Sequence, residues 1–197
     1  MLEWLKNINK DYPDFWKRYL LKFEKKSNRY VALKLESSGE NSEKDIVLSI
    51  GAIGVENNSI VVNDAFDVVI MQYKYIHDNG LVNEYIVHKS KNKTSEQIAI
   101  QQFIDYIGNA VLVGYHINAT IEMINQSLDK INCGRIKNEA FDVEVMYKKI
   151  HEITDKSFSL DKLFKINKIQ QNEFESPFED AFSIALLFLK FKAKLKL

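Results

Sequence analysis

Every second residue from Val31 to Leu35 is aliphatic, which is the clearest pattern in the chain. Such alternation places successive side chains on opposite faces and predicts a half-buried β-strand. Lys34 and Glu36 fall together on the face opposite the aliphatic residues. The strand is expected to end at the polar residues that follow Glu36.

Two longer apolar runs follow, at residues 46–55 and 60–70, and both predict strands. The polar segment between them, residues 56–59, contains two asparagines, which tolerate the positive φ of a tight hairpin turn. These three strands are therefore expected to pair antiparallel, each with the next.

Apolar residues recur at helical spacing in the second half of the chain. Thr94 and Gln97 stand at capping-box spacing, so a helix is expected over residues 94–108. The short apolar run 110–113 predicts a buried parallel strand, with another helix after it. A last strand is expected at residues 141–145.

Two later helix starts carry capping signals. Ser159 precedes a short apolar segment, and Ser176, Pro177 and Glu179 combine an N-cap, a first-turn proline and a capping-box glutamate. Taken in order, the elements predict an α/β fold with a mixed five-stranded sheet flanked by helices. Its first three strands are expected to be antiparallel.

Residues 1–27 are predicted to form a helical extension, followed by one domain over residues 28–197. Aromatic and apolar residues recur at helical spacing in the extension, interrupted by Pro13. Its second half is basic and contains Lys17, Arg18, Lys22, Lys25, Lys26 and, at the boundary, Arg29. This basic face is either a solvated surface of a docked helix or a contact for nucleic acid or a protein partner.

The composition is that of an ordinary globular protein, with 46% hydrophobic and 27% charged residues. A formal net charge of +0 excludes a global field that attracts nucleic acid or membrane, although a local patch would still attract them. The single Cys133 excludes an internal disulfide and suits a reducing, cytoplasmic setting. No cationic leader opens the sequence and no run is long enough to span a bilayer, so a membrane partner is not expected.

The end of the first strand resembles the first motif of the 3′–5′ exonucleases related to the proofreading (epsilon) subunit of bacterial DNA polymerase III. In that family the strand carries Asp-x-Glu, then two hydroxyl residues and Gly. Glu36, Ser37, Ser38 and Gly39 match this motif, whereas Lys34 stands at the position of the Asp. The resemblance covers residues 28–192 and implies a ribonuclease-H-like fold.

The second family motif, Gly-His-Asn followed by three residues and Asp, corresponds to the segment from Gly114 to Thr120. Its spacing holds, but Thr120 replaces the Asp that ligates metal in the family. His116 lies within this motif and is either a ligand or a surface or supporting histidine.

The third family motif places a general-base His five residues before an Asp near the start of the last helix. Asp180 matches the Asp, and Glu175 stands where the family has His. Glu175 is the weaker base because the unperturbed pKa of glutamate lies well below neutrality. Its alternative role is that of an exposed acid before a helix N-terminus.

The resemblance implies two divalent metal ions, held by carboxylates, that activate water and stabilise the leaving oxygen of a phosphodiester. The family site brings about −4 of carboxylate charge to these ions. Here Glu36, Asp180 and Lys34 sum to about −1, or about −2 with Glu175, which leaves two Mg²⁺ ions undercompensated. The alternative is that Lys34 is an ordinary exposed strand lysine.

Three functions are compatible with these residues. The leading hypothesis is a degenerate exonuclease that needs no cofactor and binds single-stranded nucleic acid or a protein partner. The second is an active exonuclease that uses Glu36, Asp180, Glu175 and His116 around one Mg²⁺ or Mn²⁺. The third is a structural partner of another protein. The candidate nucleic-acid contacts are Ser37, Ser38, His116, Lys89, Lys91 and Lys93.

Overall fold

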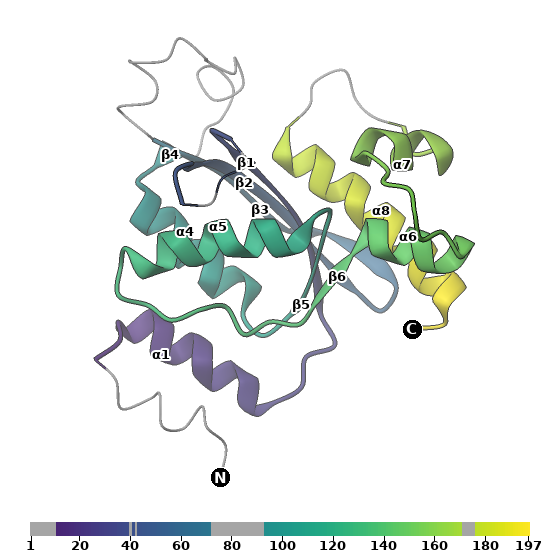
Figure 1. Cartoon of the computed structure of the whole chain (residues 1–197). Coiled ribbons are helices and arrows are strands. Elements are labelled where there is room, and N and C mark those ends of the chain that lie inside the picture. The colour runs from purple at the N-terminus through teal and green to yellow at the C-terminus, as the bar shows by residue number, and fades with distance from the viewer. Residues whose placement is uncertain (1–10, 40, 42, 72–92, 171–175) are drawn as a thin grey trace.

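The computed structural model describes residues 11–39, 41, 43–71, 93–170 and 176–197. A six-stranded sheet lies between two layers of helices, with α4 and α5 on one side and α6, α7 and α8 on the other (Figure 1). The helices are α1 (Asp14–Leu21), the short 3₁₀ helix η2 (Lys22–Glu24), α4 (Glu96–Ile107), α5 (Ile117–Asp129), α6 (Val143–His151), α7 (Leu160–Ile166) and α8 (Pro177–Leu195).

The sheet has the strand order β4-β3-β2-β1-β5-β6. Its strands are β1 (Tyr30–Ser37), β2 (Val47–Glu56), β3 (Ser59–Ile70), β4 (Lys93–Thr94), β5 (Val111–Gly114) and β6 (Ala140–Asp142). The first three strands pair antiparallel, and β5 pairs parallel with β1. The predicted mixed sheet is therefore confirmed, and the structure adds the two-residue strand β4 at its edge as a sixth strand.

The β2–β3 hairpin forms where the two asparagines predict it. Asn57 and Asn58 have φ of 49° and 61°, the left-handed conformations that a tight hairpin turn requires. A bulge then shifts the pairing register between Ile53 and Gly54, so that Gly51 lies opposite Asp67. Asp64, within the bulge, accepts two hydrogen bonds from the guanidinium of Arg29, at 2.7 and 2.8 Å.

The two faces of β1 belong to two different hydrophobic cores, as the alternation predicts. Val31, Leu33 and Leu35 pack in the core under α1, α4 and α5. Ala32 packs in the opposite core with residues from α6, α7 and α8. Lys34 and Glu36 follow Ala32 at every second position, so they lie on the α8 side of the sheet.

Two predicted boundaries are wrong, and each has a local cause. Thr94 pairs with Ile70 in the sheet, so α4 begins after Ser95 rather than at a Thr94 cap. The predicted strand 141–145 stops at Asp142, because the Asp142 side chain accepts hydrogen bonds from two backbone N–H groups and starts α6.

The two later capping signals are confirmed. The Ser159 side chain accepts a hydrogen bond from Lys162 N and caps α7. The Ser176 side chain accepts one from Glu179 N at 3.2 Å, with Pro177 at the first position of α8. These caps fix where α8 begins, and its first turn bears on the candidate site.

Helix α1 is docked on the domain by aromatic side chains. Trp16 and Tyr19 are 1% and 0% exposed and belong to the same core as α4 and α5. The Tyr19 hydroxyl donates to Asn138 Oδ1 at 2.6 Å and accepts from Lys137 N at 2.8 Å. Burial raises the pKa of Tyr19 above its usual value, and backbone hydrogen bonds offset only part of this rise.

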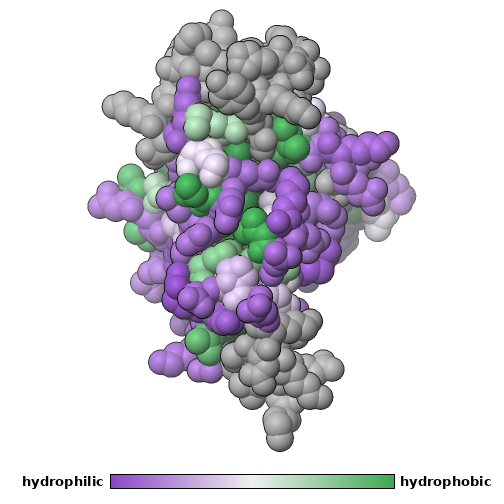
Figure 2. All heavy atoms as spheres, turned by 90° about the vertical axis from the view of Figure 1, so that its left-hand side faces the viewer, coloured by the Kyte–Doolittle hydropathy of each residue, from purple (hydrophilic) through white to green (hydrophobic). Residues whose placement is uncertain are grey.

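The surface seen from the left of Figure 1 is mostly hydrophilic, with hydrophobic residues in small, separate groups (Figure 2). Within the part of the chain that the structure describes, no helix has both the length and the apolar composition needed to cross a membrane.

Candidate functional site

A pocket of about 320 Å³ opens where the carboxyl end of β1 meets the first turn of α8. Its described lining consists of Lys34, Leu35, Glu36, Ser37, Ser176, Pro177 and Asp180. Three residues singled out by the motifs, Lys34, Glu36 and Asp180, therefore lie around one pocket, although they come from opposite ends of the chain.

Glu36 is held by the neighbouring strand. It lies opposite Ser49 in the β1–β2 register, and Ser49 Oγ donates a hydrogen bond to Glu36 Oε2 at 3.0 Å. Ser49 is 0% exposed, so its hydroxyl depends on a protein acceptor. Sheet pairing and this hydrogen bond together fix the carboxylate at the pocket wall.

Asp180 reaches the same pocket because α8 sits directly on the sheet at Gly51. A Cβ atom added to Gly51 would lie 2.2 Å from Phe178 N and 2.3 Å from Pro177 C. No larger residue fits this position unless the backbone of α8 moves. Gly51 is the β2 partner of Lys34, so the missing side chain lets the first turn of α8 come beside Lys34.

Lys34 is the only cationic residue in the described lining of this pocket. Its side chain is partly exposed, and no ion pair between described residues includes it. Lys34 therefore lines the same pocket as Glu36 and Asp180.

The described residues of the pocket do not suit a pair of divalent metal ions. Hard cations need oxygen ligands, and the lining offers the carboxylates of Glu36 and Asp180 beside an ammonium. Among the described residues, no group of three or more His, Cys, Asp or Glu side chains could hold a metal ion. The positive charge of Lys34 would add to the repulsion between two dications.

The hydroxyl groups after Glu36 make hydrogen bonds within their own loop. Ser37 Oγ donates to Gly39 O at 2.6 Å, and Ser38 Oγ donates to Asp45 Oδ1 at 2.8 Å. Ser38 Oγ also accepts a hydrogen bond from Ile46 N at 3.1 Å. Of these two predicted nucleic-acid contacts, only Ser37 lines the pocket.

The second motif lies at the start of α5, outside the described lining of the pocket. His116 is the N-cap residue of α5, in a left-handed conformation with φ 49°. Its ring stacks on Tyr115, and its Nε2 lies 3.1 Å from Glu144 Oε2. Thr120 is partly exposed in the first turn of the same helix.

Glu144 is a buried carboxylate that sequence reasoning missed. Besides His116 it binds Lys148 Nζ at 2.7 Å, Phe158 N at 2.9 Å and Ser157 Oγ at 3.0 Å. Burial alone would raise the pKa of Glu144, but these hydrogen bonds outweigh it and lower the pKa to about 2. The carboxylate thus ties the second motif to α6 and to the loop before α7.

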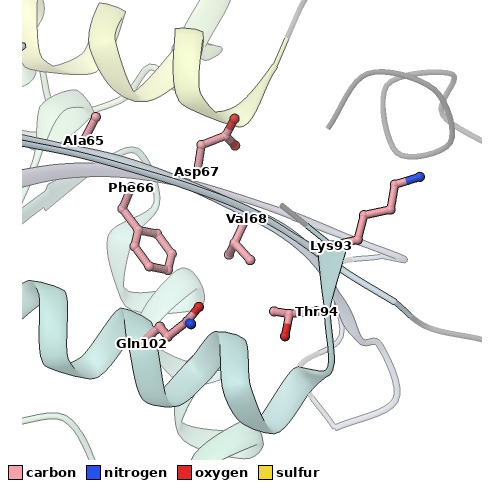
Figure 3. Close-up of a pocket in the computed structure, with 7 residues that line it drawn as sticks. All are labelled: Ala65, Phe66, Asp67, Val68, Lys93, Thr94 and Gln102. Atoms are coloured by element: carbon pink, nitrogen blue, oxygen red, sulfur yellow. The ribbon is translucent and has the colours of Figure 1, made fainter. Parts of the chain in front are cut away.

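Asp67 is a second acidic residue that the motifs do not include. It lies opposite Gly51 on β3, in the same row of the sheet as Lys34. Figure 3 shows Asp67 on the α8 side of the sheet, whereas Phe66 and Val68 point toward α4. Asp67 and Lys93 help to line a separate pocket of about 440 Å³ at the sheet edge (Figure 3).

Three predicted site residues, Glu175, Lys89 and Lys91, lie outside the described residues. Lys93 is described and exposed, at the start of β4.

Comparison of the sequence with known proteins finds distant relatives, and no family model matches the chain. The chain is 21% identical over 166 residues to the DNA polymerase III subunit epsilon of Aquifex aeolicus, covering 82% of this chain and 79% of that protein. It is 22% identical over 171 residues to the PolC-type DNA polymerase III of Caldanaerobacter subterraneus, covering 85% of this chain and 12% of that protein.

Comparison of the structure with solved structures finds a similar fold in exonuclease I. The fold matches E. coli exonuclease I in complex with a dT13 oligonucleotide with a TM-score of 0.65 at 12% identity, covering 86% of this chain and 42% of the other. It matches a complex of exonuclease I with SSB-Ct with a TM-score of 0.64, covering 87% and 42%. The chain thus spans less than half of exonuclease I. It has the ribonuclease-H-like fold of 3′–5′ exonucleases and is similar in sequence to the epsilon subunit of DNA polymerase III.

Proposed function

We propose that this chain is an exonuclease-fold domain that binds single-stranded nucleic acid without efficient hydrolysis. The observation that carries the proposal is the place of Lys34, which lines one pocket with Glu36 and Asp180. The match to exonuclease I bound to a dT13 oligonucleotide supports the choice of ligand, although the chain spans less than half of that protein.

The charge of the pocket supports binding without metal chemistry. Two Mg²⁺ ions about 4 Å apart repel each other by many kcal/mol even at an effective dielectric constant of about 20. The described pocket residues supply two carboxylates to offset this repulsion. The ammonium of Lys34 reduces their combined charge from about −2 to about −1. Lys34, which has no ion pair with a described residue, can instead contact a phosphate oxygen.

A second candidate function is an active exonuclease with a reduced acidic site. It is favoured by one observation, namely that Glu36 and Asp180 line the same pocket. These two carboxylates would hold one Mg²⁺ or Mn²⁺, with Glu175 or His116 as the base. His116 is held beside Glu144 and is not in the described lining, which weakens its part in this alternative.

Nuclease activity separates the two candidates. Purified chain, incubated for hours with 3′-labelled single-stranded DNA in Mg²⁺ or Mn²⁺, is expected to release no nucleotide above background. An active epsilon-type exonuclease serves as the positive control. Mg²⁺-dependent release that Glu36→Ala and Asp180→Ala both abolish would establish the second candidate in place of the first.

Restoring the family residues tests whether Lys34 and Thr120 are the defects. Lys34→Asp alone should not create an exonuclease, because the second-motif carboxylate and the histidine base are still missing. Lys34→Asp combined with Thr120→Asp and Glu175→His should bind Mg²⁺, seen as a melting temperature that rises with Mg²⁺ and falls with chelator. The unmodified chain should show no such rise, and a rise of several degrees in it would contradict the proposal.

A further inference from the structure

Three lysines surround a hollow at the end of the sheet opposite the candidate site. The hollow has a volume of about 170 Å³, and its lining includes Lys25 and Lys26, just before β1, and Lys137, just before β6. Phe23, Ser27, Asn109, Val111 and Glu139 complete the described lining. Because β1 is eight residues long, this lysine hollow lies about 25 Å from the pocket at the other end of the strand.

The fold fixes the backbone segments that carry these lysines. Asn109 Nδ2 donates hydrogen bonds to Lys22 O at 2.8 Å and to Lys25 O at 2.6 Å, and so holds the turn after η2. Lys137 N donates to the Tyr19 hydroxyl, which is fully buried. The tertiary structure therefore brings Lys137 to the same hollow as Lys25 and Lys26, which are neighbours in the sequence.

The charge of the lysine hollow is poorly neutralised by the protein itself. Other cations nearby are occupied, since Arg29 pairs with Asp64 and Arg18 lies 3.8 Å from Asp105. No ion pair between described residues includes Lys25, Lys26 or Lys137. Glu139 is the one carboxylate in the described lining, which leaves an excess of about two positive charges.

A larger hollow continues this surface. It has a volume of about 560 Å³, shares Lys25, Lys26, Ser27 and Asn109 with the lysine hollow, and extends to Asn57 at the β2–β3 turn. Its lining is dominated by basic residues, amides and one hydroxyl, with Glu56 as its described acid. Such groups suit the phosphates and sugars of a nucleic-acid backbone.

We propose that the lysine hollow is a second binding site for single-stranded nucleic acid, besides the Lys34 pocket. Lys25, Lys26 and Lys137 would bind its phosphates. Phe23 packs edge-on to Tyr19 in the core and is partly exposed at the wall of the hollow, so the exposed part of its ring is available for base stacking. A protein partner is the weaker fit, because the core of a protein interface needs large apolar or aromatic anchors and Phe23 is the only aromatic residue in the described lining. This inference concerns different residues from the proposed function, but it shares the same ligand.

The test measures the affinity for an oligothymidylate of about 20 nucleotides, long enough to span several phosphate contacts, across a range of KCl concentrations. The triple variant Lys25→Gln, Lys26→Gln, Lys137→Gln should bind at least about tenfold more weakly at low salt. The slope of log K against log salt should fall by about 2, since three phosphate contacts contribute about 0.7 each for a single strand. The matched control Lys149→Gln, Lys165→Gln, Lys194→Gln removes the same charge from exposed sites on α6, α7 and α8 and should bind like the unmodified chain.

The possible results distinguish the lysine-hollow inference from the proposed function. Equal affinity and slope in the two triple variants would overturn the lysine hollow as a contact. A loss of binding in Lys34→Gln with none in the lysine-hollow variant would overturn this inference and leave the proposed function standing. No binding of the oligonucleotide by the unmodified chain would overturn both, and salt-dependent binding of polyglutamate in its place would assign the surface to an acidic protein. Unchanged circular dichroism melts confirm that the variants are folded.

Discussion

Gly51→Ala is expected to lower the free energy of unfolding by about 3 kcal/mol, near the upper end of what one added methyl group costs in a packed interior. The new Cβ would lie 2.2 Å from Phe178 N, and real Cβ atoms essentially never approach a heavy atom so closely. The obstacle is the backbone of α8, which cannot turn aside as a flexible side chain does. The first turn of α8 must therefore lift from the sheet, and Asp180 moves with it.

Urea denaturation of Gly51→Ala and of a second glycine variant checks this result. Gly134→Ala is the matched control, because its Cβ would lie no closer than 3.3 Å to a neighbour, the hydroxyl of Tyr12. Gly134→Ala should change the free energy of unfolding by much less than Gly51→Ala does. Alanine also reduces the conformational freedom of the unfolded chain, which offsets part of any loss. Similar losses at both positions would show that the contact between α8 and the sheet is not as tight as described.

Glu144→Gln is expected to lower the free energy of unfolding by about 3 kcal/mol at neutral pH. The pKa of Glu144 falls from 4.5 to about 2 in the folded chain, and each tenfold change in a proton-binding constant corresponds to about 1.4 kcal/mol. A carboxylate with a lowered pKa contributes its full stabilisation above the pKa of the unfolded chain. That contribution is lost as the pH falls from about 5 toward 2.

The difference in stability between the unmodified chain and Glu144→Gln should therefore shrink over this pH range. Taking the difference isolates Glu144 from the other carboxylates, which titrate in both proteins. Glu122→Gln is the control, because Glu122 pairs with Arg135 on the surface, where ion pairs are screened and contribute little. A difference that stays constant down to about pH 2 would mean that the hydrogen bonds of Glu144 do not depend on its charge.

Local patterns predict most of the fold because they act over a few residues. The aliphatic alternation of β1, the asparagines of the hairpin turn and the cap at Ser176 all report directly on backbone geometry. The wrong prediction of a strand at residues 143–145 also has a local cause. Asp142 can end a strand or cap a helix, and only its hydrogen bonds to the following N–H groups decide between them.

The site is less predictable, since its contacts join distant segments. Counting outward from the hairpin turn would place Gly51 opposite Asp64, but the bulge after Gly54 puts it opposite Asp67. Counting residues along the sequence therefore does not predict that Lys34, Gly51 and Asp67 lie in one row across the sheet. The cluster around Glu144 is hidden for a similar reason, because it depends on a loop before α7 that carries no motif.

The docking of α1 has a consequence for the order in which the molecule is assembled during synthesis. Tyr19 is hydrogen-bonded to Lys137 and Asn138, which lie 118 and 119 positions later in the chain. Helix α1 therefore cannot make all its contacts with the domain until those residues have been made. At about 5–20 residues per second the ribosome needs about 6–24 s to add that length. Until the end of this interval, Trp16 and its neighbours lack part of the surface that later buries them. Helix α1, the first helix among the described residues, thus reaches its final contacts only after residues 137 and 138 have been made, and until then the nascent chain presents an aromatic segment that chaperones can recognise.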